Sequence, residues 1–180
     1  MKGTAWVAAA LLLLVGCGST QPGTDSEMDA FNKETEAAIA RLKGKDPGIK
    51  KWFDEKSYGY VVFPGVGKGG LVVGGAHGRG QVYEKGKHIG YADLMQGTVG
   101  FQAGGQSFIE VIFFEDRTAL NAFKEGNWEM GAQVSAVAVK QGASSAADYT
   151  KGICVFTMAS GGLMAEATVG GQKFKYVTKK

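Results

Sequence analysis

The stretch from Pro64 to Gly80, PGVGKGGLVVGGAHGRG, contains the pattern G-x-G-x-x-G at residues 65–70. In dinucleotide-binding proteins this pattern follows a strand and opens a helix whose N-terminus meets the pyrophosphate. Here it follows a predicted strand at 58–63 but leads into residues 71–76, which have the composition of another strand. Lys68 also lacks the G-x-x-x-x-G-K-[ST] arrangement of a nucleotide P-loop. We therefore predict a hairpin whose glycines supply positive φ angles and close strand approach, rather than a nucleotide site.

The other side chains that could do chemistry show no catalytic spacing. His77 and His88 are separated by more residues than a metal-binding helix or finger allows. Ser160-Gly-Gly is not flanked as G-x-S-x-G, and Cys154 lies in an apolar run, where a buried thiol acts as a small hydrophobe. We expect no enzymatic activity, no cofactor and no metal. The sequence gives no reason to pair the remaining carboxylates: Glu110, Glu115, Asp116 and Glu166.

Basic and aromatic residues occur together in the segment 41–56. Trp52 and Phe53 share one short predicted helix with Lys50 and Lys51, and a basic helix with an aromatic face is typical of an interfacial membrane binder. Alternatively, the two rings plug one end of the sheet and the lysines form a solvated rim. The segment has six basic residues, Arg41, Lys43, Lys45, Lys50, Lys51 and Lys56, against the acidic residues Asp46, Asp54 and Glu55.

Three further cations lie in the glycine-rich stretch, namely Lys68, His77 and Arg79. Flanking glycines let backbone N–H groups approach an anion, so these side chains are candidates for phosphate contact. Together with Lys43, Lys45, Lys50, Lys51, Trp52 and Phe53, they form the set of residues for which lipid contact is predicted.

The N-terminus has the pattern of an export signal. A short apolar run, too short to span a bilayer as a helix, ends in Leu14-Val15-Gly16-Cys17, which resembles a bacterial lipobox. We expect residues 1–16 to be removed and Cys17 to receive covalent lipid, two or more acyl chains giving stable anchoring. Gly18 then favours the outer membrane of a bacterial envelope. The alternative is an ordinary secretory signal with an incidental cysteine.

The rest of the chain predicts one α+β domain with mainly antiparallel strands. After a tether at 17–25, the domain covers residues 26–180, with a helical part at 26–56 and a β-rich part at 58–178. Asp25 or Ser26 is expected to cap the first helix, Asp46-Pro47 the second, and Asp116 an internal one. We expect a small curved sheet or a closed β-barrel. The predicted strands are 58–63, 71–76, 81–84, 88–92, 97–103, 107–114, 132–139, 153–158, 163–169 and 172–177.

Several spaced blocks resemble one known family. They are Tyr58-Gly-Tyr-Val-Val-Phe-Pro, Gly67-Lys-Gly-Gly-Leu-Val-Val-Gly-Gly-Ala, Gly104-Gly-Gln-Ser107, 119–123, Glu129-Met-Gly-Ala132 and Ser160-Gly-Gly-Leu-Met-Ala-Glu-Ala. Their order is similar to that of the SYLF domain, also called the actin-binding domain of its yeast members, over roughly residues 49–177. The resemblance implies a lipid-binding module without known enzymatic activity, and it implies lipid contact partly on an N-terminal amphipathic helix, which corresponds here to 41–56.

The resemblance also limits the function that we expect. Eukaryotic members bind phosphoinositides and actin, but residues 133–139 depart from their pattern, and an exported bacterial protein is not expected to meet actin. Nucleic acid is not expected either, since removing Lys2 from the 20 basic residues leaves 19 against 17 acidic ones. We therefore expect a lipid-anchored protein whose domain binds membrane phospholipids. The alternative is a structural envelope or host-facing scaffold for an unknown protein partner.

Overall fold

The computed structural model describes residues 20–70, 73–99, 106–126, 128–131, 133–160 and 169–179. The predicted signal peptide, Cys17, Glu166 and residues 163–168 of the strand expected at 163–169 lie outside these residues.

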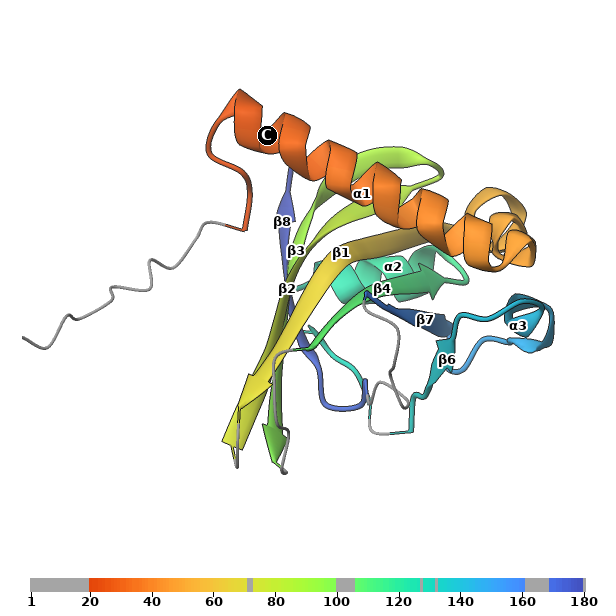
Figure 1. The fold of residues 1–180 in the computed structure, drawn as a ribbon. Helices are drawn as coiled ribbons and strands as arrows, with labels where there is room; N and C mark the ends of the chain where they lie inside the picture. The colour runs from red at the N-terminus through yellow and green to blue at the C-terminus, as the bar shows by residue number, and fades with distance from the viewer. Residues whose placement is uncertain are drawn as a thin grey trace, which may run out of the picture.

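The described strands form one curved, mainly antiparallel sheet beside helices (Figure 1). Its order is β5-β8-β3-β2-β1-β4-β7-β6, and only the β6–β7 pair is parallel. The α+β class and the curved sheet are thus confirmed. The closed barrel is not, because β5 and β6 remain the edges and the terminal strand lies between β5 and β3. The strands are β1 (Gly59–Gly70), β2 (Val73–Glu84), β3 (Lys87–Val99), β4 (Gln106–Phe114), β5 (Trp128–Glu129), β6 (Ala136–Ala138), β7 (Ile153–Ala159) and β8 (Lys173–Thr178).

The helices begin at residues that can cap them. Helix α1 (Asp25–Lys45) is capped by Thr24, one residue before the predicted cap, because Glu27 completes a reciprocal capping box with Thr24. A 3₁₀ turn η1 (Pro47–Ile49) and a π turn η2 (Trp52–Lys56) follow, as the Asp46-Pro47 signal predicted. Helix α2 (Arg117–Lys124) begins after Asp116, whose Oδ1 accepts from the Ala119 N–H at 2.8 Å.

Residues 132–148 differ from the prediction. The strand expected at 132–139 is reduced to β6, and a short helix, α3 (Ala143–Ala146), follows it. Gly142 permits this because its φ of 81° starts the helix from a left-handed conformation.

The sheet has a buried cluster on each face. On one face, α1 and the η turns cover strands β1, β4 and β7, with Leu42, Ile49 and Trp52 in the cluster. On the other face, Leu120 and Phe123 of α2 pack against Phe114 and Phe174. Helix α1 does not cover the beginning of β2 and the end of β3, which extend past the helix (Figure 1).

The glycines of the opening stretch lie within strands rather than in turns. β1 runs through residues 65–70 as one strand, which agrees with the absence of a dinucleotide loop. No glycine described between 65 and 80 has positive φ, so that half of the prediction is wrong. Close approach is confirmed: a Cβ at Gly80 would lie 2.7 Å from Phe63 Cδ1, and one at Gly78 would lie 2.9 Å from Val66 Cγ2.

Candidate functional site

The basic rim, defined as Arg41, Lys43, Lys45, Lys50, Lys51 and Lys56, surrounds the turn between α1 and η2. Trp52 and Phe53 hold this turn to the sheet. Trp52 is 1% exposed, donates from Nε1 to the Ser144 carbonyl at 3.0 Å, and packs against Phe113 and Phe156. Phe53 is also buried. The burial of both rings agrees with the alternative in which they plug the sheet.

The buried rings also position two cations of the basic rim. Lys43 Nζ lies 4.9 Å from the centre of the Phe53 ring, and Lys56 Nζ lies 4.6 Å from the centre of the Trp52 ring. Such cation–π contacts hold the ammonium groups at the edge of the aromatic cluster. The aromatic residues of this segment thus help to orient its charges.

Asp46 faces inward, so its negative charge does not lie on the surface of this segment. It is 2% exposed, and its carboxylate accepts from the N–H groups of Gly48, Gly142 and Ser144 at 3.1, 3.2 and 2.7 Å. Burial alone would raise the pKa of Asp46, but these donors outweigh burial and hold the pKa below its usual value. The carboxylate therefore acts as a clamp between η1 and α3.

The remaining charges of the basic rim are poorly compensated. Lys50 pairs with Asp54 at 2.6 Å, and Glu55 is the other exposed acid of the segment. Among the residues that the structure describes, Arg41, Lys45 and Lys51 are exposed and form no ion pair. The structure thus brings the four predicted lysines, Lys43, Lys45, Lys50 and Lys51, together at one end of the molecule.

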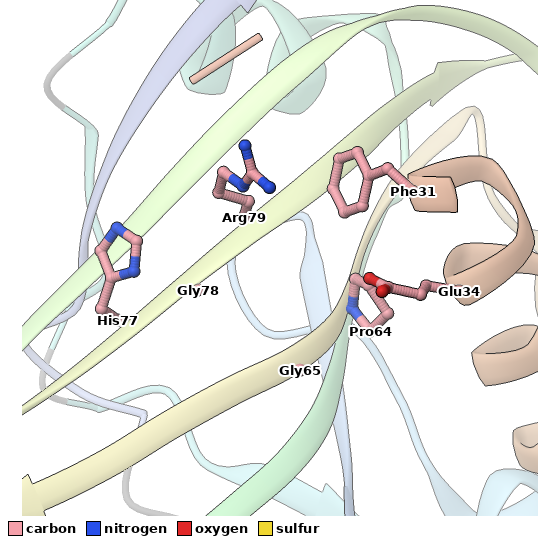
Figure 2. A pocket seen from close by; sticks show the side chains of 7 residues that line it. All are labelled: Phe31, Glu34, Pro64, Gly65, His77, Gly78 and Arg79. Carbon is pink, nitrogen blue, oxygen red and sulfur yellow. The ribbon is translucent and has the colours of Figure 1, made fainter. Parts of the chain in front are cut away.

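A bulge in β1 opens a pocket beside α1. The register shifts between Val62 and Val66, around Pro64, which cannot donate a ladder hydrogen bond. The resulting pocket of about 240 Å³ is shown in Figure 2, with Arg79 Cζ 5.4 Å from the centre of the Phe31 ring. Its lining residues are Phe31, Glu34, Pro64, Gly65, His77, Gly78 and Arg79.

A second pocket of about 340 Å³ shares Glu34, Pro64 and Gly65 with the first and is extended by Arg41 and Ile109. The two pockets therefore follow one flank of α1. Their walls combine two guanidinium groups with the His77 imidazole and the Glu34 carboxylate. Such a lining suits a polar ligand held by charge.

Lys68 does not join His77 and Arg79. Paired residues in a sheet place their side chains on the same face, and Lys68 pairs with Ala76 of the α2-side cluster. His77 and Arg79 face the side of the sheet on which α1 lies. The three predicted phosphate contacts are thus divided between opposite faces of the sheet.

Lys68 instead shares a face with Glu110, which sequence reasoning did not connect with it. The Glu110 side chain is fully buried, and its Oε2 accepts from Gln172 Nε2 at 2.9 Å. Burial raises the pKa of Glu110 to about 7, although the Gln172 hydrogen bond and the Lys68 charge oppose the rise. No spacing in the sequence predicts the hydrogen bond between Glu110 and Gln172, because these two residues are 62 positions apart.

The other reactive groups remain separate. Cys154 is 4% exposed, and burial raises the pKa of its thiol to about 12, which keeps it protonated at neutral pH. Across the described ranges, no group of three histidine, cysteine or carboxylate side chains is placed to hold a metal ion. In the same part of the chain, no helix combines the length and apolar composition that a membrane span requires.

Sequence reasoning predicted only His77 and Arg79 of a set of six side chains that lie beyond α1. Register places two rows on the α1 side of the sheet: Arg79, Asp93 and Lys175, then His77, Met95 and Lys173. The alternation of lysine with aromatic residues over 173–176 is a sequence signal that could have indicated this face for Lys173 and Lys175. We name these six residues the bare sheet face.

The fold and these surfaces define a small α+β module with two exposed cation-bearing regions. A family model described as Las17-binding protein actin regulator, Ysc84, matches residues 95–179. Residues 95–179 thus match this family, whose domain is the SYLF domain, and the resemblance seen in the sequence is confirmed. It is a family of binding domains that is not known as catalytic.

One curated relative extends the match toward the N-terminus. Beta cell expansion factor A of Aeromonas veronii is 32% identical over 147 residues, which are 81% of this chain and 55% of the relative. The chain therefore spans about half the length of this relative.

Proposed function

We propose that this protein is a non-catalytic, lipid-anchored protein of the bacterial envelope whose domain binds anionic phospholipid surfaces. In this proposal residues 1–16 are the signal peptide, Cys17 is acylated and held in the outer membrane, residues 17–25 are the tether, and 26–180 form the domain. Membrane phospholipid is the partner. We do not extend the actin-regulator description of the family model to this chain.

The observation that supports lipid binding best is the uncompensated charge of the basic rim. Its cations project from a turn that Trp52 and Asp46 hold in place. Binding therefore costs little conformational freedom beyond that of the lysine side chains themselves. Each Lys or Arg near an anionic bilayer contributes about 1 kcal/mol of attraction, which is screened within a Debye length. Several such groups on one rigid turn produce measurable, salt-sensitive binding.

Vesicle flotation of the acyl-free mature chain tests this function. With vesicles of phosphatidylethanolamine and phosphatidylglycerol, we expect binding at low salt that falls steeply as salt increases. Lys45→Glu with Lys51→Glu reverses two exposed, unpaired charges and should weaken binding at least tenfold, since removing about 1 kcal/mol per lysine already exceeds the 1.4 kcal/mol of a tenfold change.

A matched variant controls for net charge. Lys33→Glu with Lys87→Glu makes the same charge change at two exposed lysines outside the basic rim, and it should retain most of the binding. Equal losses in the two double variants would show that net charge alone acts. Absence of flotation of the unmodified chain at low salt would refute the proposed function.

A host-facing interaction protein is the second candidate. The observation that favours it is the name of the 32% identical relative, Beta cell expansion factor A. The flotation assay separates the candidates, because a scaffold without specific lipid binding stays with the aqueous fraction at every salt concentration.

A further inference from the structure

The second exposed region, the bare sheet face, is joined directly to the N-terminal segment. Thr20 and Pro22 are both buried, and Thr20 Oγ1 donates to Asp93 Oδ2 on β3. In the strand register, Asp93 lies opposite Arg79 of β2 on one side and opposite Lys175 of β8 on the other. The chain that precedes α1 is therefore fixed to the middle of this face.

The distance from this attachment to Cys17 is short. Three peptide units separate Cys17 from Thr20, and at 3.8 Å between consecutive Cα atoms they reach at most about 11 Å. A bilayer that holds acyl chains on Cys17 therefore comes within about 11 Å of Thr20, whatever path those residues take.

We propose that the bare sheet face is the surface on which the domain rests against the bilayer that holds its own N-terminus. The inference rests on the lipid anchor proposed above. The occupant is the anionic bilayer itself, and the acylated cysteine supplies the effective concentration that brings this face to it.

The composition of the bare sheet face agrees with this role. Met95 is 50% exposed, and it is the large hydrophobic side chain that the described part of the chain leaves open to solvent. Arg79, Lys173 and Lys175 are exposed cations around it. A thioether among basic groups matches the boundary between head groups and acyl chains, where an apolar tip and cations are stabilised together.

The acidic groups on and beside this face are already engaged. Asp93 accepts the hydrogen bond from Thr20, and Glu129 lies 3.8 Å from Lys173. The net charge of the region is therefore only weakly positive. Attachment through the tether, rather than long-range attraction, is what selects this face.

The basic rim is too far from the attachment point to take its place. Helix α1 has 21 residues and is therefore about 32 Å long, and the basic rim begins in its C-terminal turns. The reach from Thr20 to Cys17 is about a third of that length. The anchor therefore brings the bare sheet face to its own membrane first, and the basic rim is left at the far end of the helix.

Site-specific fluorescence in the full, acylated chain tests this orientation. The sequence contains only two cysteines, of which Cys17 would be acylated and Cys154 is buried, so a new cysteine can be labelled selectively. We would place a polarity-sensitive fluorophore on Met95→Cys and, as the matched control, on Glu125→Cys at the end of α2 on the opposite face. Both proteins are reconstituted into phosphatidylethanolamine–phosphatidylglycerol vesicles.

The expected result is quenching of the label at 95 by nitroxide lipids and protection from aqueous iodide, with the reverse pattern at 125. Lys173→Glu with Lys175→Glu should return iodide access to position 95 by severalfold. Iodide quenching at 95 equal to that at 125, with Cys17 shown by mass spectrometry to be acylated, overturns the orientation alone. An unmodified Cys17 overturns the anchor and the orientation with it, while protection from both quenchers indicates a protein contact and overturns the bilayer as occupant.

Discussion

The basic rim and the bare sheet face occupy opposite ends of α1 and obtain their charge in different ways. The basic rim comes from one continuous segment, in which the buried residues Trp52 and Asp46 fix the turn and leave the lysines outside. The bare sheet face is assembled from β2, β3 and β8, whose residues become neighbours only through strand pairing.

This difference has a consequence for binding. The basic rim has uncompensated charge and is remote from Thr20, so its attraction depends on salt and on anionic lipid. The bare sheet face is nearly balanced in charge and lies beside Thr20, so its contact depends on the proposed anchor. One surface is expected to act without acylation and the other only with it.

Removing Trp52, which supports the basic rim, should have the largest effect on the stability of the protein. Trp52→Ala deletes a side chain that lies 5.1–5.6 Å, between ring centres, from Tyr149, Phe156 and Phe113. Loss of this packing should lower the free energy of unfolding by about 3–5 kcal/mol, measured by urea denaturation. Lys51→Ala, at an exposed position next to it, should change stability by less than about 0.5 kcal/mol. Similar values for the two would mean that the basic rim is not supported by this ring.

The face opposite both surfaces should respond to pH through Glu110. Its folded pKa of about 7 exceeds the usual 4.5, so the protonated form is favoured in the folded state. The contribution of Glu110 to the unfolding free energy should therefore be highest below about pH 4.5 and should decrease as the pH rises to about 7. At 1.36 kcal/mol per pKa unit the decrease is at most about 3 kcal/mol.

Glu110→Gln removes this titration while keeping an oxygen that can accept from Gln172. Its stability relative to the wild type should increase between pH 5 and pH 8, as measured by denaturation at each pH. Glu115→Gln, at an exposed carboxylate on the loop after β4, is the control and should show no such trend. A constant difference across this range would indicate that Glu110 stays ionised in the folded protein.

Local signals in the sequence predicted the parts of the fold that neighbouring residues determine. Asp46-Pro47 and Asp116 start helical segments as expected, and the cap of α1 is displaced by one residue only because Thr24 forms the box with Glu27. The lysines of the basic rim could be predicted from the sequence because they all belong to one continuous segment, residues 41–56.

Features that depend on pairing between distant strands were not predictable from one sequence. The glycines at 65–70 suggested a break, but neighbouring strands on both sides keep β1 continuous across them. Lys68 was grouped with His77 and Arg79 by proximity in sequence, whereas the register places it on the other face. Lys173, Lys175 and the Glu110–Gln172 pair depend on the same long-range register.

The smallest loss of stability that we predict comes from a substitution in β2, one of the three strands that form the bare sheet face. Gly80→Ala places a Cβ 2.7 Å from the Phe63 ring and 2.9 Å from the Val62 carbonyl oxygen, so β2 must shift against β1. We expect a loss of about 1–3 kcal/mol in the free energy of unfolding. Because Arg79 precedes Gly80, the shift should also move Arg79 away from Phe31 and change iodide access to a label at position 95.

Gly97→Ala is the matched substitution on β3, where nothing lies within 4 Å of the added Cβ. It should leave stability within about 1 kcal/mol of the wild type, since it removes freedom mainly from the unfolded chain. If both substitutions are tolerated equally, the close approach of β1 and β2 is not what fixes the bare sheet face. If Gly80→Ala alters label access while vesicle flotation of the acyl-free chain is unchanged, the two surfaces act independently, as their different origins require.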